Sequence, residues 1–300
     1  MVPEYPDFKP LEFKDHDLIH ESLNSSTRNI CELCPGNFFI WEEFDHTKLT
    51  MINQNLCVLI SPANEPPYFL EPLGRQKIKE TIDICLKHSR RISRASEDFL
   101  SKFPQEDYQI SPLRDQFDYV FSRQILAELK GKKFDGKRNH IKKFQRRFPR
   151  YGFIPLNISL KKAALLLFEK WFSIRKQTKY FVKLAYEAQK EALLLAFSNY
   201  DKLNLLGSAI LIDRSIKGFI LGSTLNRETI AVHFLYSDTN LPGISQTLLW
   251  EACNKTFNNF DYVNLEQDLG IPGLRAAKLS YHPLRLEEKF EIIAPLARRS

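Results

Sequence analysis

The sequence has no apolar run long enough to cross a membrane. A transmembrane helix needs about 20 apolar residues, and the longest apolar stretches, residues 163–168 and 192–197, are much shorter. The N-terminal segment also lacks the cationic start and apolar centre of a secretory signal, because Glu4, Asp7 and Glu12 lie among prolines. We therefore expect a cytoplasmic protein, with a peripheral position at the inner face of the membrane as the alternative.

The sequence contains few cysteines, and their number is odd. Five cysteines in 300 residues, at positions 31, 34, 57, 85 and 253, argue against a disulfide framework. Cys31 and Cys34 have Cys-x-x-Cys spacing, but a structural zinc site needs a second pair or two suitably spaced histidines. His16, His20 and His46 do not provide them. We expect no metal and interpret the thiols as buried and free.

The basic character of the chain lies in one segment. The composition, 43% hydrophobic and 26% charged, is that of a folded protein of one large or two ordinary domains. The net charge is +7, yet residues 130–150 alone contain ten Lys or Arg and a single acid, Asp135. A solvated charged face is the ordinary explanation. Ten cations repel one another, however, which favours an anionic partner, either RNA or an anionic lipid surface.

Hydrophobic periodicity predicts a clear element order in the second half of the chain. It predicts helices over 160–176 and 181–200, strands over 205–213, 216–222 and 228–236, a helix over 243–256, a strand from 262, a helix over 274–281 and a strand over 289–293. This is the element order of the Gcn5-related N-acetyltransferase (GNAT) fold.

The first half has a vaguer version of the same order. Strands are predicted over 55–61, 68–71, 91–93, 108–110 and 118–121, with helices over 75–88, 122–129 and 139–148. We predict an α/β protein with two GNAT-like domains in tandem, each a mixed, mostly antiparallel sheet flanked by helices. The domains are residues 1–155, ending in the basic helix, and residues 156–300, although no internal sequence repeat is visible.

The predicted basic helix is amphipathic. Ile141, Phe144 and Phe148 fall on one face at spacings of three and four, which leaves the cations on the others. Phe134, Phe144 and Phe148 could stack on bases, but their spacing suits core packing better.

The most informative stretch is residues 262–283. An apolar strand ends at Leu265, turns at Gly270 and Pro272-Gly273, and restarts as a helix. Glu266 and Asp268 lie in the turn, and Arg275 and Lys278 lie on the helix. Strand ends that open onto a helix are where α/β folds place their sites. The alternative is a surface turn before a capped helix.

Two further positions have competing interpretations. The loop 240–245 leads into a helix, as does the GNAT loop whose N–H groups face the pyrophosphate of coenzyme A. Gly243 matches a glycine of that loop, and Asn240 and Ser245 are substitutes for its other residues. A simple strand-to-helix turn explains it about as well. His233 lies on the longest strand, where a packed core histidine competes with a catalytic base.

Several motifs resemble those of a known family. They are Gly131-Lys132-Lys133, residues 137–144 (Lys-Arg-Asn-His-Ile-Lys-Lys-Phe), Val232-His233, Asp238, Tyr262-Val263-Asn264 onward to Pro283, residues 37–41 (Asn-Phe-Phe-Ile-Trp) and residues 71–74 (Glu-Pro-Leu-Gly). Together they resemble the C-terminal catalytic domain of bacterial phosphatidylglycerol lysyltransferases and its stand-alone relatives, over nearly the whole chain. The resemblance implies two acetyltransferase-like domains related to the Fem peptidoglycan transferases.

The implied activity is transfer of an amino acid from aminoacyl-tRNA to a hydroxyl or amine, without a cofactor. The lysyltransferases carry a membrane domain ahead of this one and the sequence does not, so a phosphatidylglycerol-type lipid is one candidate acceptor among others. The chain also departs from many relatives in having Leu235-Tyr236 where they have Glu-Lys. A substrate contact made at that point is therefore changed.

Such a transfer needs a proton acceptor, a cation or N–H donors for the oxyanion, and a carboxylate for the amino acid's ammonium group. We assign the carboxylate role to Glu266 and Asp268 and the cationic role to Lys137, Arg138, Arg275 and Lys278. Tyr281 is placed like the acid of many acetyltransferases, and His233 is kept as a candidate base. The remaining candidate substrate-binding residues are Asn139, Asn240, Gly243, Gln246 and Asn264.

Two competing functions stay open. An acetyl-coenzyme A-dependent N-acetyltransferase predicts nucleotide binding at Gly243 and indifference to RNA. A non-catalytic RNA-binding protein predicts that the cations of residues 137–147 matter and that Glu266 does not. The acids in the most specific motif favour an enzyme, and the oligomeric state is left open.

Overall fold

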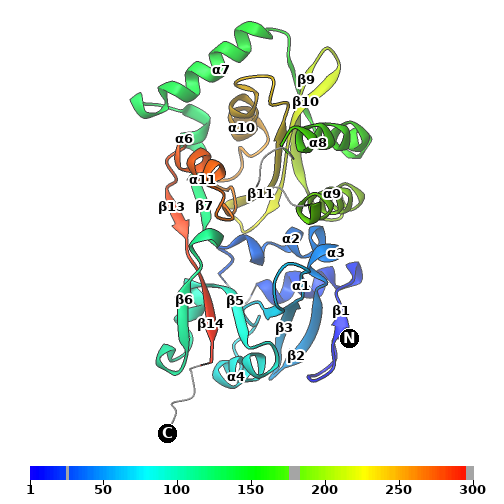
Figure 1. The fold of residues 1–300 in the computed structure, drawn as a ribbon, viewed down its shortest axis with the longest axis vertical. Helices are drawn as coiled ribbons and strands as arrows, with labels where there is room; N and C mark the ends of the chain where they lie inside the picture. Colours follow the sequence, from blue (N-terminus) through cyan, green and yellow to red (C-terminus); the bar gives the residue numbers. More distant parts are fainter. Residues whose placement is uncertain (25–26, 176–182, 295–300) are drawn as a thin grey trace. The chain divides into compact units, whose positions relative to one another are not determined.

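A computed structural model describes residues 1–24, 27–175 and 183–294 (Figure 1). These residues form two compact units. The first contains residues 1–118, 267–270 and 286–294, and the second contains residues 119–266 and 271–285. The C-terminal part of the sequence therefore contributes to both units.

The first unit contains a mixed sheet of seven strands in the order β1-β2-β3-β4-β5-β14-β6. β4 and β5 pair in parallel, and the other neighbours pair antiparallel. β3 is buried along its whole length, as its continuous apolar sequence predicts. The strands are β1 (Lys9–Pro10), β2 (Lys48–Ile52), β3 (Asn55–Ile60), β4 (Tyr68–Phe69), β5 (Arg91–Ser96), β6 (Gln109–Pro112) and β14 (Lys289–Ile293).

The helices of this unit are short apart from one. They are α1 (His16–Leu23), α2 (Pro35–Ile40), α3 (Glu42–Asp45), α4 (Ile78–Ser89) and α5 (Glu97–Leu100). α4 packs Ile82, Cys85 and Leu86 into a core that also contains Phe69 and Ile292. These three residues recur at spacings of one, three and four, so α4 buries a single stripe.

The second unit also contains a mixed sheet of seven strands, in the order β13-β7-β12-β11-β10-β9-β8. β11 and β12 pair in parallel, whereas β8 to β11 form an antiparallel meander and β12 pairs antiparallel with β7. The strands are β7 (Asp118–Ser122), β8 (Gly152–Pro155), β9 (Leu206–Ile212), β10 (Ser215–Thr224), β11 (Thr229–Ser237), β12 (Tyr262–Asn264) and β13 (Arg285–Glu287).

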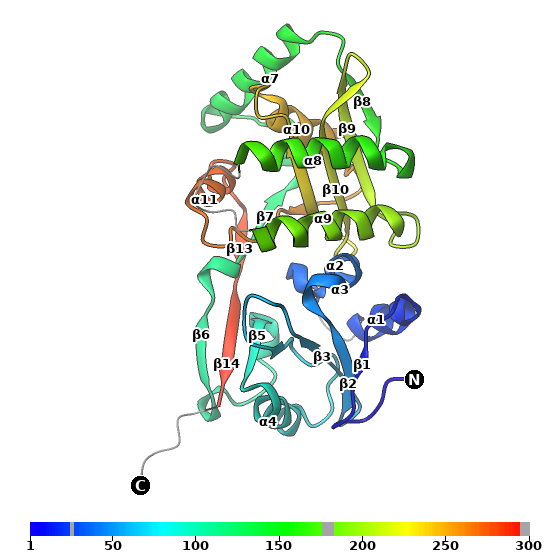
Figure 2. The same ribbon diagram turned by 45° about the vertical axis from the view of Figure 1, so that its right-hand side comes forward.

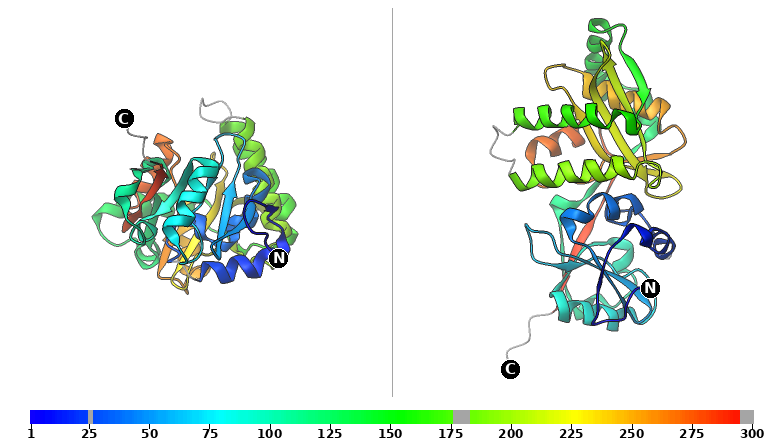
Figure 3. Two further views of the ribbon diagram at one scale, coloured as in Figure 1. Left: turned by 90° about the horizontal axis from the view of Figure 1, so that it is seen from below. Right: turned by 90° about the vertical axis from the view of Figure 1, so that its right-hand side faces the viewer.

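Helices cover both faces of the second sheet. α8 and α9 lie side by side on one face, and α10 lies on the other with α6 and α7 packed against it (Figures 2 and 3). The helices are α6 (Arg123–Glu128), α7 (Asp135–Arg147), α8 (Lys161–Arg175), α9 (Lys183–Ser198), α10 (Ile244–Lys255) and α11 (Pro272–Leu279). Within the described residues, no helix is long and apolar enough to cross a membrane.

A β-bulge interrupts the pairing of β10 and β11. Leu221 lies opposite Phe234 but Gly222 lies opposite Val232, so His233 is the extra residue on β11. A bulge kinks a strand and changes the direction in which its side chains point, and bulges are frequent beside active sites.

The structure confirms the predicted α/β class, the mixed sheets and most of the predicted elements. Two predicted features differ in extent. The basic helix begins at Asp135, four residues before its predicted start. The predicted domain boundary at residue 155 falls at the end of β8, inside the second unit, because α6 and α7 pack against α10. Two predicted helix termini lie outside the described residues: the end of the first helix at residue 176 and the start of the next at residues 181–182. The five cysteines are buried and none forms a disulfide, as predicted.

Candidate active site

The turn after β12 holds Glu266 in a fixed backbone conformation. Glu266 has a φ of 57°, in the left-handed region that non-glycine residues rarely adopt. The side-chain oxygen of Asn264 accepts the Glu266 N–H at 2.7 Å. Lys278 Nζ, from α11, donates to the carbonyl oxygens of Leu265 and Glu266 at 2.6 and 3.0 Å. Asn264 and Lys278, both predicted site residues, thus position Glu266.

Strand register brings His233 beside Glu266. Ala231 of β11 lies opposite Asn264 of β12 in the parallel pair, so the residues two positions further along also lie side by side. His233 Nδ1 and Glu266 Oε1 are 2.8 Å apart, and the exposed fractions of these side chains are 0% and 15%. The histidine is buried, as the core interpretation predicted, yet it is paired with a carboxylate as a catalytic base would be.

Ser223 completes this arrangement from the other side. Its Oγ lies 2.7 Å from His233 Nε2. Because the carboxylate of Glu266 accepts the proton on Nδ1, the neutral ring presents Nε2 as an acceptor and the Ser223 hydroxyl donates to it. We did not predict Ser223 from the sequence. The signal that could have identified it is its place on the strand that pairs with the histidine's own strand.

The start of the basic helix contacts the segment after α11. Lys137 Nζ donates to Ser280 Oγ at 2.6 Å and lies 3.8 Å from the centroid of the Tyr281 ring. Burial lowers the pKa of Lys137. Burial, followed by the nearby Cys253, raises the pKa of Tyr281 well above its usual range, so its hydroxyl stays protonated. Two residues predicted as separate site members therefore lie in one contact.

The outer surface of α7 and its flanking loops is strongly cationic. Phe134, Ile141 and Phe144 are buried, which confirms the predicted core face and places two of the three candidate stacking residues in the interior. Arg138 donates to the carbonyl oxygens of Leu129 and Gly131 and pairs with Asp135, so it fastens the loop before the helix. Asn139 is exposed, and the exposed cations are Lys130, Lys132, Lys133, Lys142, Lys143, Arg146, Arg147 and Arg150.

The candidate coenzyme A loop is closely packed against α7. Gly243 has a φ of +91°, and a Cβ there would lie 2.3 Å from the carbonyl oxygen of His140. Glycine is therefore required at the start of α10 by backbone conformation and by helix packing. Asn240 is exposed, and Gln246 is half-buried on the first turn of α10.

Asp268 is assigned to a different unit from His233 and Glu266. Asp268 belongs to the first unit, where it is fully buried, pairs with Arg114 at 3.2 Å and accepts the Gly270 N–H at 2.9 Å. Arg275 is half-buried on α11, one turn before Lys278. The two carboxylates that we predicted to act together thus belong to different units.

A second buried polar cluster lies within the first unit. Cys31, Glu32 and Asp118 have ligand atoms within 4.8 Å of one another, a spacing that would suit a metal ion. The ammonium group of Lys289 contacts all three: Glu32 Oε2 at 2.5 Å, Asp118 Oδ1 at 2.7 Å and Cys31 Sγ at 3.5 Å. An internal lysine therefore fills the position that a bound cation would take.

Comparison with known proteins identifies the family. The model of the family "Phosphatidylglycerol lysyltransferase, C-terminal" matches residues 24–293. The chain belongs to this family. A comparison with curated proteins found no match.

Several solved structures share the fold. The chain is similar to a conserved protein of unknown function from Bacteroides thetaiotaomicron, with a TM-score of 0.85 and 28% identity over 98% of this chain and 100% of that one. It is also similar to L-PGS from Bacillus licheniformis (TM-score 0.63, 14% identity, 100% and 95% covered). A tandem GNAT protein from the clavulanic acid biosynthesis pathway gives a TM-score of 0.50 at 9% identity, with 96% and 98% covered. The fold is thus two GNAT-like domains in tandem, as predicted, and it is an acyltransferase fold.

Tyr236, at the position where we expect a departure from relatives, packs among aromatic rings. Tyr236 is buried, with its ring centroid 5.1 Å from that of Phe168 and 4.9 Å from that of Trp171. Its hydroxyl donates to Gln189 at 2.6 Å. Burial, and then the nearby Glu266, raise the pKa of Tyr236 above its usual range. At this position the chain has an aromatic core where we noted a charged pair in relatives.

Proposed function

We propose that the protein is an aminoacyltransferase that moves an amino acid from aminoacyl-tRNA to a hydroxyl or amine acceptor. The observation that carries the proposal is the hydrogen-bonded series Ser223, His233 and Glu266 in the second unit. A hydroxyl, an imidazole and a carboxylate in this order form a proton-accepting system whose base is oriented by an acid. Family membership supports acyl transfer as the reaction class.

The chemistry follows from this order. The acceptor's oxygen or nitrogen attacks the ester carbonyl of the donor, and its proton passes to Ser223 Oγ as the Ser223 proton passes to His233 Nε2. Glu266 stabilises the resulting imidazolium charge. Collapse of the tetrahedral intermediate breaks the ester bond to the tRNA. The ribose oxygen that is released takes up the proton held by His233.

The choice of aminoacyl-tRNA as the acyl donor rests on the charge of the second unit. Eight exposed cations on α7 and its flanking loops offer contacts to phosphates, and α7 belongs to the same unit as His233. Acetyl-coenzyme A is the weaker alternative, because the packing of α7 already explains the glycine at the start of α10. A phosphatidylglycerol-type lipid is a candidate acceptor.

The test measures transfer directly. Purified protein is incubated with tRNAs charged with labelled amino acids, in the presence of phosphatidylglycerol vesicles or a soluble amine. We expect label to leave one charged tRNA and to appear on the acceptor. Glu266→Gln should lower kcat by about 10²- to 10⁴-fold, with the melting temperature nearly unchanged. Glu191→Gln, which alters an exposed acid on α9, is the matched control.

Two results would reject the proposal. Acetyl transfer from acetyl-coenzyme A with no dependence on charged tRNA would make the protein an acetyltransferase. Tight binding of tRNA with no transfer to any acceptor, and no effect of Glu266→Gln, would leave an RNA-binding protein.

A further inference from the structure

Two of the ten cations in residues 130–150 are not exposed. Lys137 and Arg138, in the first turn of α7, are half-buried, whereas the other eight face solvent. Arg138 donates to the carbonyl oxygens of the loop that precedes its own helix. Lys137 instead reaches a segment 143 residues later in the chain, where its Nζ donates to Ser280 Oγ at 2.6 Å. Lys137 is thus the cation of the basic segment that connects it to another part of the second unit.

This contact lies at the C-terminus of α11. Ser280 caps the helix, and its hydroxyl donates to the carbonyl oxygen of Ala277 at 2.6 Å. Because the hydroxyl proton is used in this way, the oxygen of Ser280 accepts from Lys137. The last carbonyl groups of a helix carry a partial negative charge, which an ammonium group stabilises. Lys137 therefore holds α11 both through a hydrogen bond and through the helix dipole.

The next residue, Tyr281, strengthens the attachment. Its ring centroid lies 3.8 Å from Lys137 Nζ, a cation–π contact. The same ring packs edge-on against Phe121, with the centroids 6.4 Å apart. Phe121 belongs to β7, where it lies opposite Val263 of β12. Lys137 thus joins the start of α7 to the end of α11 and, through Tyr281, to the strand that pairs with β12.

Helix α11 in turn holds the backbone of Glu266. None of the residues of α11 is buried, so its position depends on side-chain contacts at its surface. Lys278, in its last turn, donates to the carbonyl oxygens of Leu265 and Glu266 at 2.6 and 3.0 Å. Glu266 has a left-handed φ of 57°, a conformation that surrounding contacts must maintain. Its carboxylate lies 2.8 Å from His233 Nδ1. A shift of α11 therefore displaces the acid that orients the histidine.

We propose that Lys137 is a positioning residue for the pair formed by His233 and Glu266. It fixes the end of α11, and Lys278 on α11 fixes the turn that presents Glu266. This role differs from the substrate-binding cation that we predicted from the sequence at position 137. Because Lys137 lies in the first turn of α7, one series of contacts within the second unit joins the cationic helix to the histidine.

The first test is nuclear magnetic resonance of the full chain with isotope-labelled histidine nitrogens. The proposal rests on the proposed function for the role of His233 as the base, but this test requires no transfer reaction. The variant His233→Gln assigns the two ring nitrogens among the seven histidines. We expect Lys137→Met to move the Nδ1 resonance of His233, because the carboxylate of Glu266 changes its position beside the ring. Lys137→Arg, which keeps a cation at the end of α11, should restore most of the wild-type signal.

The second test measures transfer at several concentrations of the charged tRNA. Lys137→Met should lower kcat about tenfold, because a displaced acid no longer orients the base. Lys142→Met, which removes an exposed cation from the same helix, should instead raise the KM for the tRNA. Ser280→Ala should lower kcat as well. The double variant Lys137→Met, Ser280→Ala should lose no more than Lys137→Met alone, because both residues act through one hydrogen bond.

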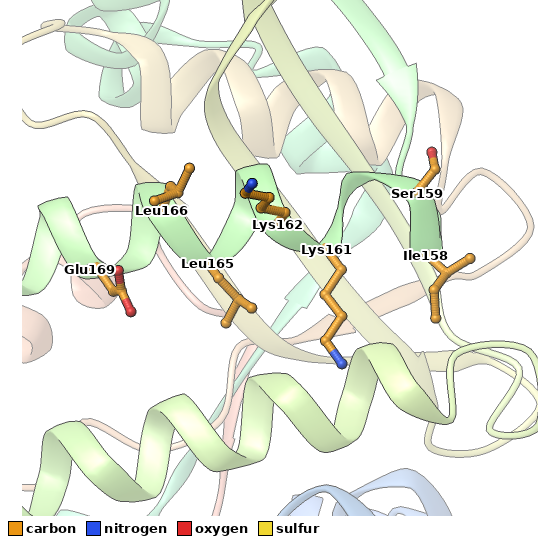
Figure 4. A pocket seen from close by; sticks show the side chains of 7 residues that line it. All are labelled: Ile158, Ser159, Lys161, Lys162, Leu165, Leu166 and Glu169. Carbon is orange, nitrogen blue, oxygen red and sulfur yellow. The ribbon is translucent and has the colours of Figure 1, made fainter.

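Lys162→Met is the matched control. Lys162 is an exposed lysine of the same unit, on α8, which covers the other face of the sheet from α7. It lines a hollow of about 430 Å³ (Figure 4). This variant loses the same charge as Lys137→Met and keeps the contacts of α11, so it should retain the wild-type kcat and His233 resonances. Circular dichroism and thermal unfolding show whether each variant is folded.

Two results would overturn the proposal. One is a folded Lys137→Met variant whose His233 resonances match those of the wild type, whatever its kcat. The other is an equal shift of these resonances in Lys162→Met, which would trace the effect to net charge. Absence of transfer from every charged tRNA would reject the proposed function, yet the resonances of His233 would still decide the role of Lys137. The two proposals can therefore fail separately.

Discussion

Gly222 controls how closely β10 approaches β11 beside His233. A Cβ on Gly222 would lie 2.3 Å from the carbonyl oxygen of Ala231, a backbone atom that cannot move without disturbing the bulge. We expect Gly222→Ala to destabilise the protein by about 2 to 3 kcal/mol and to lower transfer activity through His233. Urea unfolding and initial rates measure the two effects.

Gly152→Ala is the control for this change, because a Cβ there would meet only Leu211 Cβ at an ordinary 3.8 Å. It should leave stability within about 1 kcal/mol of the wild type. Equal losses from the two substitutions would show that the bulge tolerates a side chain.

Lys289 is a structural cation. Its own burial lowers its pKa, but Asp118, Cys31 and Glu32 outweigh this and raise it above the usual range, so the ammonium stays charged. Lys289→Met leaves Asp118 buried without that charge, and we expect a loss of about 3 to 5 kcal/mol in the free energy of unfolding. Lys87→Met, on the exposed face of α4, should change it by less than about 0.5 kcal/mol. A fully stable Lys289→Met variant would contradict the assignment.

Asp45 gives the stability a pH dependence. Burial, with Glu32 and Glu65 nearby and Arg94 opposing, raises the pKa of Asp45 to about 7. An acid with a raised folded-state pKa binds its proton more tightly in the folded state, so the free energy of unfolding falls as pH rises from about 4 to 7. We expect the protonation of Asp45 to contribute about 1 to 2 kcal/mol to the free energy of unfolding at low pH. This figure is lower than the full pKa shift implies, because the carboxyl retains some solvent contact.

Urea unfolding across this pH range measures the effect. Asp45→Asn should flatten the fall in the free energy of unfolding, because the amide does not titrate. A variant that keeps the wild-type pH dependence would show that another group causes it.

At the scale of the elements, local patterns predicted structure where one signal dominated. The meander β9 to β11 follows from three mostly apolar runs separated by short turns, helix α10 follows from its start at Gly243, and the basic helix follows from Ile141 and Phe144. β8 was missed because it has four residues, with Gly152 and Pro155 at its ends, which weaken any strand pattern. The pairing of Glu266 with His233 was missed because strand register is set by contacts between segments distant in sequence.

The cationic face of α7 should bind tRNA as an element. We expect the double variant Lys142→Glu, Lys143→Glu to weaken tRNA binding at least tenfold at low salt. The slope of log K against log salt should fall by about 0.7 to 0.9 for each phosphate that the variant no longer neutralises.

A double variant with the same net charge provides the control for α7. Lys14→Glu, Lys87→Glu changes two exposed lysines of the first unit. It should retain most of the binding. Equal weakening by both variants would mean that total charge, rather than α7, attracts the tRNA.

At the scale of the whole molecule, the division of the chain into two units could not be predicted from the sequence. Residues 267–270 and β14 belong to the first unit although they follow most of the second. β14 pairs between β5 and β6, more than 170 residues earlier in the chain. No local sequence pattern indicates that a strand so late in the chain pairs with β5 and β6. The segment 262–283, which carries the motif, therefore supplies Glu266 to one unit and Asp268 to the other.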